Sequence, residues 1–151
     1  MTELDEMTEL DVIFAKIVFR IAGVLGVVTL TPLYFMLDRI GNQYPPAITH
    51  ADFYYGFIGV GLAWQAAFLV IASDPVRFRP FMIAAILEKF IYVMSVSTLY
   101  AQGRLEGGQL AVAGPDFALG ILFIAAFLKT SAYDAKQAAE TLPALRYPYY
   151  E

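Results

Sequence analysis

The sequence contains no cysteine and only one histidine, His50, among its 151 residues. The absence of cysteine excludes disulfides, thiolate metal sites, iron–sulfur clusters and cysteine nucleophiles. A single histidine excludes bis-histidine haem and the multi-histidine zinc sites. Charged residues are scarce as well: they make up 16% of the chain, whereas hydrophobic residues make up 59%. A chain with so little polar surface is typical of an integral membrane protein, and we expect no cofactor and no metal.

Four long apolar segments account for most of the chain, at about 12–37, 53–72, 81–100 and 115–130. A helix that crosses a bilayer needs about 20 mostly apolar residues. Four buried helices of a soluble core would leave almost nothing in 151 residues to cover them. We therefore predict an all-α fold with one domain over residues 1–151, an integral membrane four-helix bundle. The segment 115–130 is short for a span, so its ends are the least well defined.

Basic residues predict the orientation of this bundle. One side of the membrane would hold seven of the ten: Lys16, Arg20, Arg77, Arg79, Lys129, Lys136 and Arg146. The other side would hold only Arg39 and Arg104, and Lys89 lies within the third span. Because cytoplasmic loops carry the excess of Lys and Arg, both termini are predicted to be cytoplasmic in a bacterial inner membrane. The acidic net charge of −4 argues against nucleic acid as a partner.

Local signals predict some details of helix ends and packing. Thr49 and Asp52 have the spacing of a capping box before the second span. Pro32 predicts a bend near the end of the first span, with the preceding threonine hydroxyls bonded to carbonyls freed by the bend. The second span has small residues at steps of four, and we expect another helix to pack against this seam: Gly59, Ala63 and Ala67, flanked by Gly56 and Ala66.

Ionisable residues within a span suggest function, because they are costly in lipid. Glu88 and Lys89 lie seven and eight residues into the third span, and Gln65 lies at a similar depth in the second. Arg20 enters from the same side on the first span. Hydrogen-bonding residues continue along the face of Glu88 at plus four and plus seven. The predicted ligand-binding set is therefore Arg20, Gln65, Glu88, Lys89, Tyr92 and Ser95.

Two interpretations of this set stay open. In the structural one, Lys89 extends along its own stem to cytoplasmic headgroups and Glu88 forms an internal ion pair with Arg20. In the functional one, the set forms a polar pocket for a ligand headgroup, or Glu88 is a proton site. Lys89 is rotated by roughly 100° from Glu88, so the two are expected to point to different places.

A second group of polar residues lies towards the other side of the membrane: Asp38, His50, Asp52, Glu106 and Asp116, with five nearby tyrosines. Carboxylates and a histidine can bind a divalent cation, but their spacing matches no ligand pattern. The tyrosines fit an interfacial aromatic belt. Asp116 is the exception in this group, because a short fourth span would place its carboxylate in the mouth of the bundle.

Three segments form a signature within the polar loops and helices: Trp64-Gln65, Asp74-Pro75-Val76-Arg77-Phe78-Arg79 and Leu87-Glu88-Lys89. In length, four-span topology and polar third helix, the chain resembles small bacterial four-helix membrane proteins that include the DoxX-like group. The resemblance implies the topology derived above and no particular reaction.

Three functions compete. The first is a non-enzymatic accessory subunit or scaffold of a membrane complex, or a protein that binds a lipid-like or pigment-like apolar ligand. The chain lacks a nucleophile–base pair, which favours this function. The second is a membrane enzyme that uses Glu88 as acid or base on an apolar substrate. The third is an oligomeric proton-coupled transporter. The expected partners are the bilayer and other membrane subunits or further copies of the chain.

Overall fold

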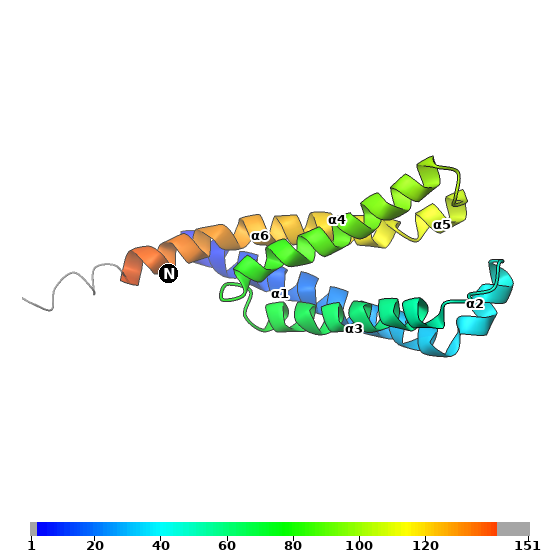
Figure 1. Cartoon of the computed structure of the whole chain (residues 1–151). Helices are drawn as coiled ribbons and strands as arrows, with labels where there is room; N and C mark the ends of the chain where they lie inside the picture. The colour runs from blue at the N-terminus through cyan, green and yellow to red at the C-terminus, as the bar shows by residue number, and fades with distance from the viewer. Residues whose placement is uncertain (1–2, 142–151) are drawn as a thin grey trace, which may run out of the picture.

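The computed structural model describes the backbone of residues 3–141 and the side chains of residues 9–131. Arg146 and the side chain of Lys136, both counted in the orientation argument, lie outside the described part. The described backbone is helical and contains no strand (Figure 1). Its elements are α1 (Glu3–Leu30), the 3-10 helix η1 (Thr31–Phe35), α2 (Leu37–Gln43), α3 (Ala51–Ser73), α4 (Arg79–Ala101), α5 (Gly107–Ala111) and α6 (Gly114–Thr141).

Four segments are long and apolar enough to cross a membrane: Glu9–Phe35, Ala51–Ser73, Arg79–Ala101 and Gly107–Ser131. They confirm the predicted all-α, four-helix membrane fold, and the chain is a multi-pass membrane protein. The fourth segment is longer than the expected 115–130, because α5 precedes it and α6 continues beyond Thr130.

The four long helices form two pairs. Helix α3 packs along α1, and α4 packs along α6. The pairs meet where α1 contacts α6, whereas α3 and α4 make few contacts although they are consecutive in the chain. Figure 1 shows the result: α3 and α4 lie close at the turn formed by residues 74–78 and diverge from there. We call the end with this turn the terminal end, because α1 begins and α6 ends there, and the end with α2 and α5 the opposite end.

The core lies where the two pairs meet. Phe19 of α1, Phe68 of α3 and Phe123 of α6 are fully buried. The rings of Phe19 and Phe123 stack with centroids 4.2 Å apart, and the ring of Phe68 meets that of Phe123 edge-on at 5.0 Å. Three aromatic side chains from three helices therefore join the pairs.

Glycines on α1 bring α1 and α3 together. Gln65 of α3 is buried, and its side-chain amide lies directly on Gly26, where a Cβ atom would clash with it. A Cβ atom at Gly23 would come within 2.7 Å of Leu69. Small residues let helices in lipid approach closely, since mutual hydrophobicity gains nothing there. The pair is therefore built on the small residues of α1.

The small-residue seam predicted on α3 is largely uncovered. Ala63 and Ala66 are exposed, and a Cβ atom at Gly56 would meet nothing within 4 Å. The expectation that another helix of this chain packs there is therefore wrong for most of the seam. The reason is that α1 contacts a different face of α3, the face that presents Gln65 and Leu69.

At Thr31, next to Pro32, the α-helix gives way to η1, and the hydroxyls of Thr31 and Thr29 donate to the carbonyls of Val27 and Leu25 at 2.7 and 2.9 Å. The predicted hydroxyl–carbonyl bonds are therefore present, and the bend itself stays a prediction. The predicted capping box at Thr49 and Asp52 is wrong. The N-cap of α3 is His50, one residue later than the box requires, and no side chain caps this helix.

Candidate functional site

A three-residue ion cluster lies within the membrane-spanning part of the bundle. Lys89 of α4 is 5% exposed, and its ammonium lies 2.5 Å from Oδ1 of Asp116 on α6. The same ammonium lies 3.1 Å from Oε2 of Glu88. It also sits over the ring of Phe68, 5.1 Å from the centroid, which is a cation–π distance. We call Glu88, Lys89 and Asp116 the ion cluster.

Glu88 is the less well bonded of the two carboxylates. Its hydrogen bond from Lys89 goes to Oε1 at 3.5 Å, the outer limit for such a bond. Its other oxygen, Oε2, is buried and accepts no hydrogen bond within the described part of the chain. Oε2 and the ammonium are thus close enough for an ion pair but not aligned for a hydrogen bond. Asp116 is therefore the stronger partner of Lys89.

The close packing of α4 on α6 brings the three members of the ion cluster together. Gly120 of α6 lies against α4, where a Cβ atom would come within 3.0 Å of the Phe90 ring and 3.4 Å of Lys89 Cβ. Asp116 lies one turn before Gly120 and so shares its face of α6. Glycine at this position lets the backbones approach until the Lys89 ammonium reaches the Asp116 carboxylate. At about 1.5 Å per residue, Glu88 is about 14 Å along α4 from Arg79, which places the cluster deep in the span.

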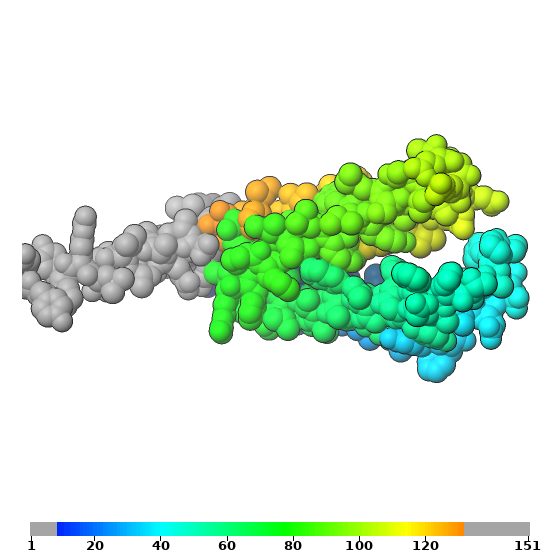
Figure 2. Space-filling model, viewed as in Figure 1, coloured from blue at the N-terminus to red at the C-terminus, as the bar shows by residue number. Residues whose placement is uncertain are grey.

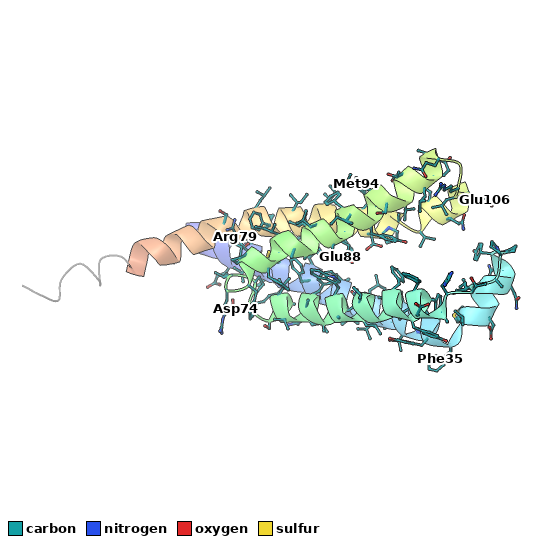
Figure 3. All side chains as sticks on the ribbon, in the orientation of Figure 1. Phe35, Asp74, Arg79, Glu88, Met94 and Glu106 are labelled. Atoms are coloured by element: carbon teal, nitrogen blue, oxygen red, sulfur yellow. The ribbon has the colours of Figure 1, made fainter. Side chains whose placement is uncertain are left out.

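The diverging helices leave a space towards the opposite end that we call the α3–α4 gap, and Figure 2 shows it open at that end. By helical spacing, Phe53, Phe57 and Val60 share one face of α3, and Glu88, Tyr92 and Ser95 share one face of α4. The rings of Phe57 and Tyr92 are in contact, with centroids 6.5 Å apart, so these two faces meet there and the gap widens beyond that contact. In Figure 3, Glu88 lies on the side of α4 that faces α3, whereas Met94 points away from it.

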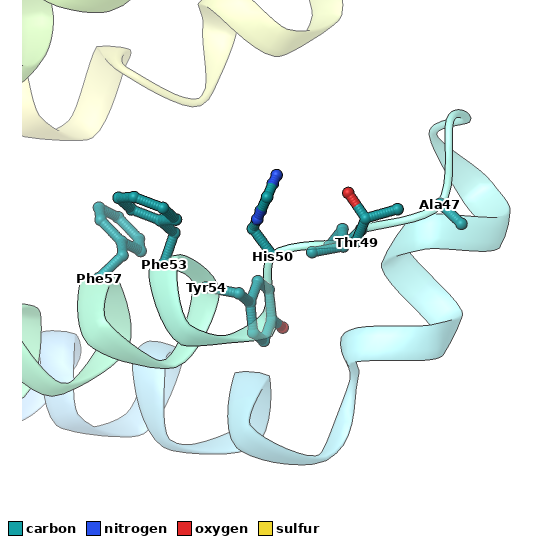
Figure 4. A pocket seen from close by; sticks show the side chains of 7 residues that line it. Ala47, Thr49, His50, Phe53, Tyr54 and Phe57 are labelled. Carbon is teal, nitrogen blue, oxygen red and sulfur yellow. The ribbon is translucent and has the colours of Figure 1, made fainter.

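The α3 wall of this gap is aromatic and exposed. Phe53 and Phe57 are 74% and 55% exposed. Figure 4 shows both rings, with His50, projecting from the first turns of α3 into open space. The hollow that they line is wide open, and its lining comes from α3 and the segment before it, so it forms only one wall of the gap.

The structure brings together only part of the predicted ligand-binding set. Glu88, Lys89 and Tyr92 lie at or beside the ion cluster. Arg20 is exposed on α1, and the expected Arg20–Glu88 ion pair is wrong: Glu88 pairs with Lys89, because α4 packs on α6 and hardly on α1. Lys89 does not extend to headgroups but stays buried.

Two further members of the set have local partners. Gln65 faces α1 and donates to the carbonyl of Gly61 at 2.9 Å. Ser95 is exposed, and its hydroxyl donates to the carbonyl of Ile91 at 2.8 Å. Such bonds within a helix satisfy a hydroxyl without a ligand. Binding by Arg20, Gln65 or Ser95 stays a prediction.

Asp116 reaches the bundle interior, as the sequence allowed, but for a different reason. It does so by pairing with Lys89 rather than because the fourth helix is short. The other members of its predicted group do not converge: within the described residues, no three side chains of His, Asp or Glu are placed to hold a metal ion. Sequence reasoning missed the exposed pair Phe53 and Phe57, although their spacing of four residues places them on one helix face.

Comparison of the chain with models of protein families, with curated proteins and with solved structures gave no significant match. The resemblance to DoxX-like proteins therefore stays a prediction, and the argument about function depends on the geometry alone. That geometry combines an apolar gap that opens towards the opposite end of the bundle and a polar cluster towards its narrow end. Such an arrangement can hold an apolar molecule by its body and contact one polar group of it.

Proposed function

We propose that this protein is a non-catalytic membrane protein that binds an apolar ligand in the α3–α4 gap. The observation that supports this most directly is the exposed aromatic wall of Phe53 and Phe57 opposite Tyr92. Aromatic rings bury large apolar areas, so leaving two of them uncovered within one gap favours an occupant. Bulk lipid chains can fill the gap, but a ligand with a rigid apolar body would lose less conformational entropy there.

The ion cluster supports binding over catalysis. A proton-coupled transporter would have to break the contacts of Lys89 with the two carboxylates in each cycle. An enzyme that uses Glu88 as acid or base would have to transfer a proton beside this ammonium. A binding protein needs neither step.

We also propose that both termini face the cytoplasm of a bacterial inner membrane. Arg77, Arg79 and Lys129 lie at the terminal end, and Arg39 and Arg104 lie at the opposite end. This bias is the one that the positive-inside rule describes. Fusing alkaline phosphatase after residue 102, and separately after residue 75, tests it. Activity only in the first fusion is expected, and activity only in the second would contradict the orientation.

The binding proposal is tested with protein purified in lipid nanodiscs. Native mass spectrometry, with solvent extraction of the same sample, should detect one apolar compound per chain besides phospholipid. In the double variant Phe53→Ala/Phe57→Ala, the retained fraction should fall by at least about tenfold, since fully burying one such ring is worth about 1.5–3 kcal/mol and about 1.4 kcal/mol is a factor of ten. Both side chains are exposed, so the fold should be unaffected.

The matched control is Phe35→Ala in η1. Phe35 is 87% exposed and points away from the gap (Figure 3). Its variant should retain the compound as the unchanged protein does. Equal retention in all three proteins, or no compound other than phospholipid, would contradict the proposal. Additional chains in the native spectrum would instead favour an accessory subunit, for which the uncovered Ala63–Ala66 face of α3 offers a surface.

A further inference from the structure

The charges of the ion cluster do not cancel. Two carboxylates, Glu88 and Asp116, surround one ammonium, Lys89. The formal charge of the cluster is therefore −1 when all three groups are ionised. Within the described residues, the remaining ion pair, Lys129 with Asp11, lies elsewhere, between α6 and α1. Unbalanced charge is costly within a span, so a cluster of this kind is expected to take a compensating charge.

The exposure of the three groups shows which charge an incoming molecule meets. The side chain of Lys89 is 7% exposed, whereas those of Glu88 and Asp116 are 21% and 26% exposed. The ammonium lies over the Phe68 ring, and the more exposed side chains of the cluster are the two carboxylate residues, although Oε2 of Glu88 itself is buried. Glu88 faces the α3–α4 gap (Figure 3) and has only one long hydrogen bond on Oε1 and none on Oε2. A hydrogen-bond donor with a positive charge complements this surface, and an anion does not.

We propose that the α3–α4 gap binds a lipophilic amine, with its protonated nitrogen against Glu88 and its apolar body along Phe57 and Phe53. The inference rests on the proposed function and adds the chemistry of the ligand's polar end. A monocation brings the cluster to a formal charge of zero and supplies the donor that the Glu88 carboxylate lacks. The aromatic wall supports the same end of the ligand, because cations bind favourably near ring faces.

The test compares four probes with the same chain length: dodecylamine, dodecanol, dodecyl methyl ether and dodecanoate. Their retention by the protein in nanodiscs is measured with radiolabelled probes, and empty nanodiscs correct for partition into lipid. The amine should be retained at least about tenfold better than the alcohol or the ether, because a desolvated charge pair contributes at least a factor of this size to binding affinity. Dodecanoate should not exceed empty nanodiscs.

Glu88→Gln is the decisive variant. It keeps the shape of the side chain, leaves the Lys89–Asp116 pair and removes the residual charge. Amine retention should fall by about tenfold, while retention of dodecanol should change less than about twofold. Asp116→Asn provides a second, independent removal of the charge and should give the same result. Asp38→Asn, which removes an exposed carboxylate of α2 far from the gap, should leave both values unchanged.

Other outcomes separate the two proposals. If dodecanol is retained as well as the amine and both depend on Phe53 and Phe57 but not on Glu88, the gap binds an apolar ligand and the amine inference is overturned. If no probe depends on Phe53 and Phe57, the proposed function itself fails. If wild-type protein prefers dodecanol to dodecylamine, a proton rather than an amine neutralises the cluster, which also overturns the inference.

Discussion

The two helix pairs of this protein are held together by different chemistry. In the α1–α3 pair, Gly26 and Gly23 receive side chains of α3, and no ion pair joins these helices within residues 9–131. In the α4–α6 pair, Gly120 also allows close approach, but the buried Lys89–Asp116 ion pair joins the helices. A lipid environment permits both solutions, since helix association there depends on packing and interhelical polar bonds.

The difference also explains where the bundle opens. Helix α3 uses its close-packing face on α1, and α4 uses Lys89 and Phe90 on α6. Contacts between α3 and α4 are few, and they include the Trp64–Phe81 stack near the turn, at 6.1 Å, and the Phe57–Tyr92 ring contact further along. The α3–α4 gap is a consequence of two strong pairs, and each pair can be weakened separately.

The largest effect is expected for Lys89→Met, which removes a buried cation and leaves two partly buried carboxylates unpaired. Removing one partner of a buried ion pair typically costs about 3–5 kcal/mol. Thermal unfolding in nanodiscs, or steric trapping, should show a loss of this size. The triple variant Lys89→Met/Glu88→Gln/Asp116→Asn should recover most of it, because no charge is left unpaired. If Lys89→Met were as stable as the wild type, the Lys89–Asp116 ion pair would not be what holds α4 against α6.

An intermediate effect is expected for Gly26→Ala, which forces a methyl group onto the Gln65 amide. Overpacking a close contact typically costs about 1–3 kcal/mol. Gly56→Ala is the matched control: it places the same methyl group on a span helix where nothing lies within 4 Å. It should be neutral or slightly stabilising, since alanine is the better helix former. Equal stability of the two variants would contradict the close contact between α1 and α3.

The smallest effect is expected for Asp11→Asn. Asp11 of α1 lies 2.6 Å from Lys129 of α6, so this ion pair joins the two helix pairs, but the Lys129 side chain is 48% exposed. An exposed ion pair contributes about 0–1 kcal/mol. The loss of stability should shrink further in high salt, which screens such pairs. A loss as large as that of Lys89→Met would mean that this contact is buried in the membrane-embedded protein.

Much of the fold could be predicted from the sequence, because span length and apolar content are properties of each segment alone. The four spans and the hydroxyl–carbonyl bonds of the threonines before Pro32 follow from such local rules. The order of packing could not, because helices that are apolar all round give no periodicity to show which face meets which neighbour.

The candidate site could be predicted only in part, because the packing of the helices decides which side chains meet. Glu88 and Lys89 stand out as charges within a span, but their partners depend on packing. The expectation that they point to different places is wrong, because the long stem of Lys89 brings its ammonium back to within 3.1 Å of Glu88 Oε2. Only its depth in the membrane links Arg20 to the predicted ligand-binding set, and depth does not say which helix a side chain faces.

Helices α3 and α4 diverge from a closed terminal end, and distances between spin labels test this divergence most directly. The chain has no cysteine, so pairs introduced for labelling are the only thiols. One pair, Val70→Cys with Ile83→Cys, reports the closed end, and another, Gly56→Cys with Ser97→Cys, reports the open end. All four sites are exposed on their helices. In nanodiscs, the second pair should be clearly further apart than the first. Equal distances, or a shorter one for Gly56 and Ser97, would mean that α3 packs along α4 and that the gap does not exist.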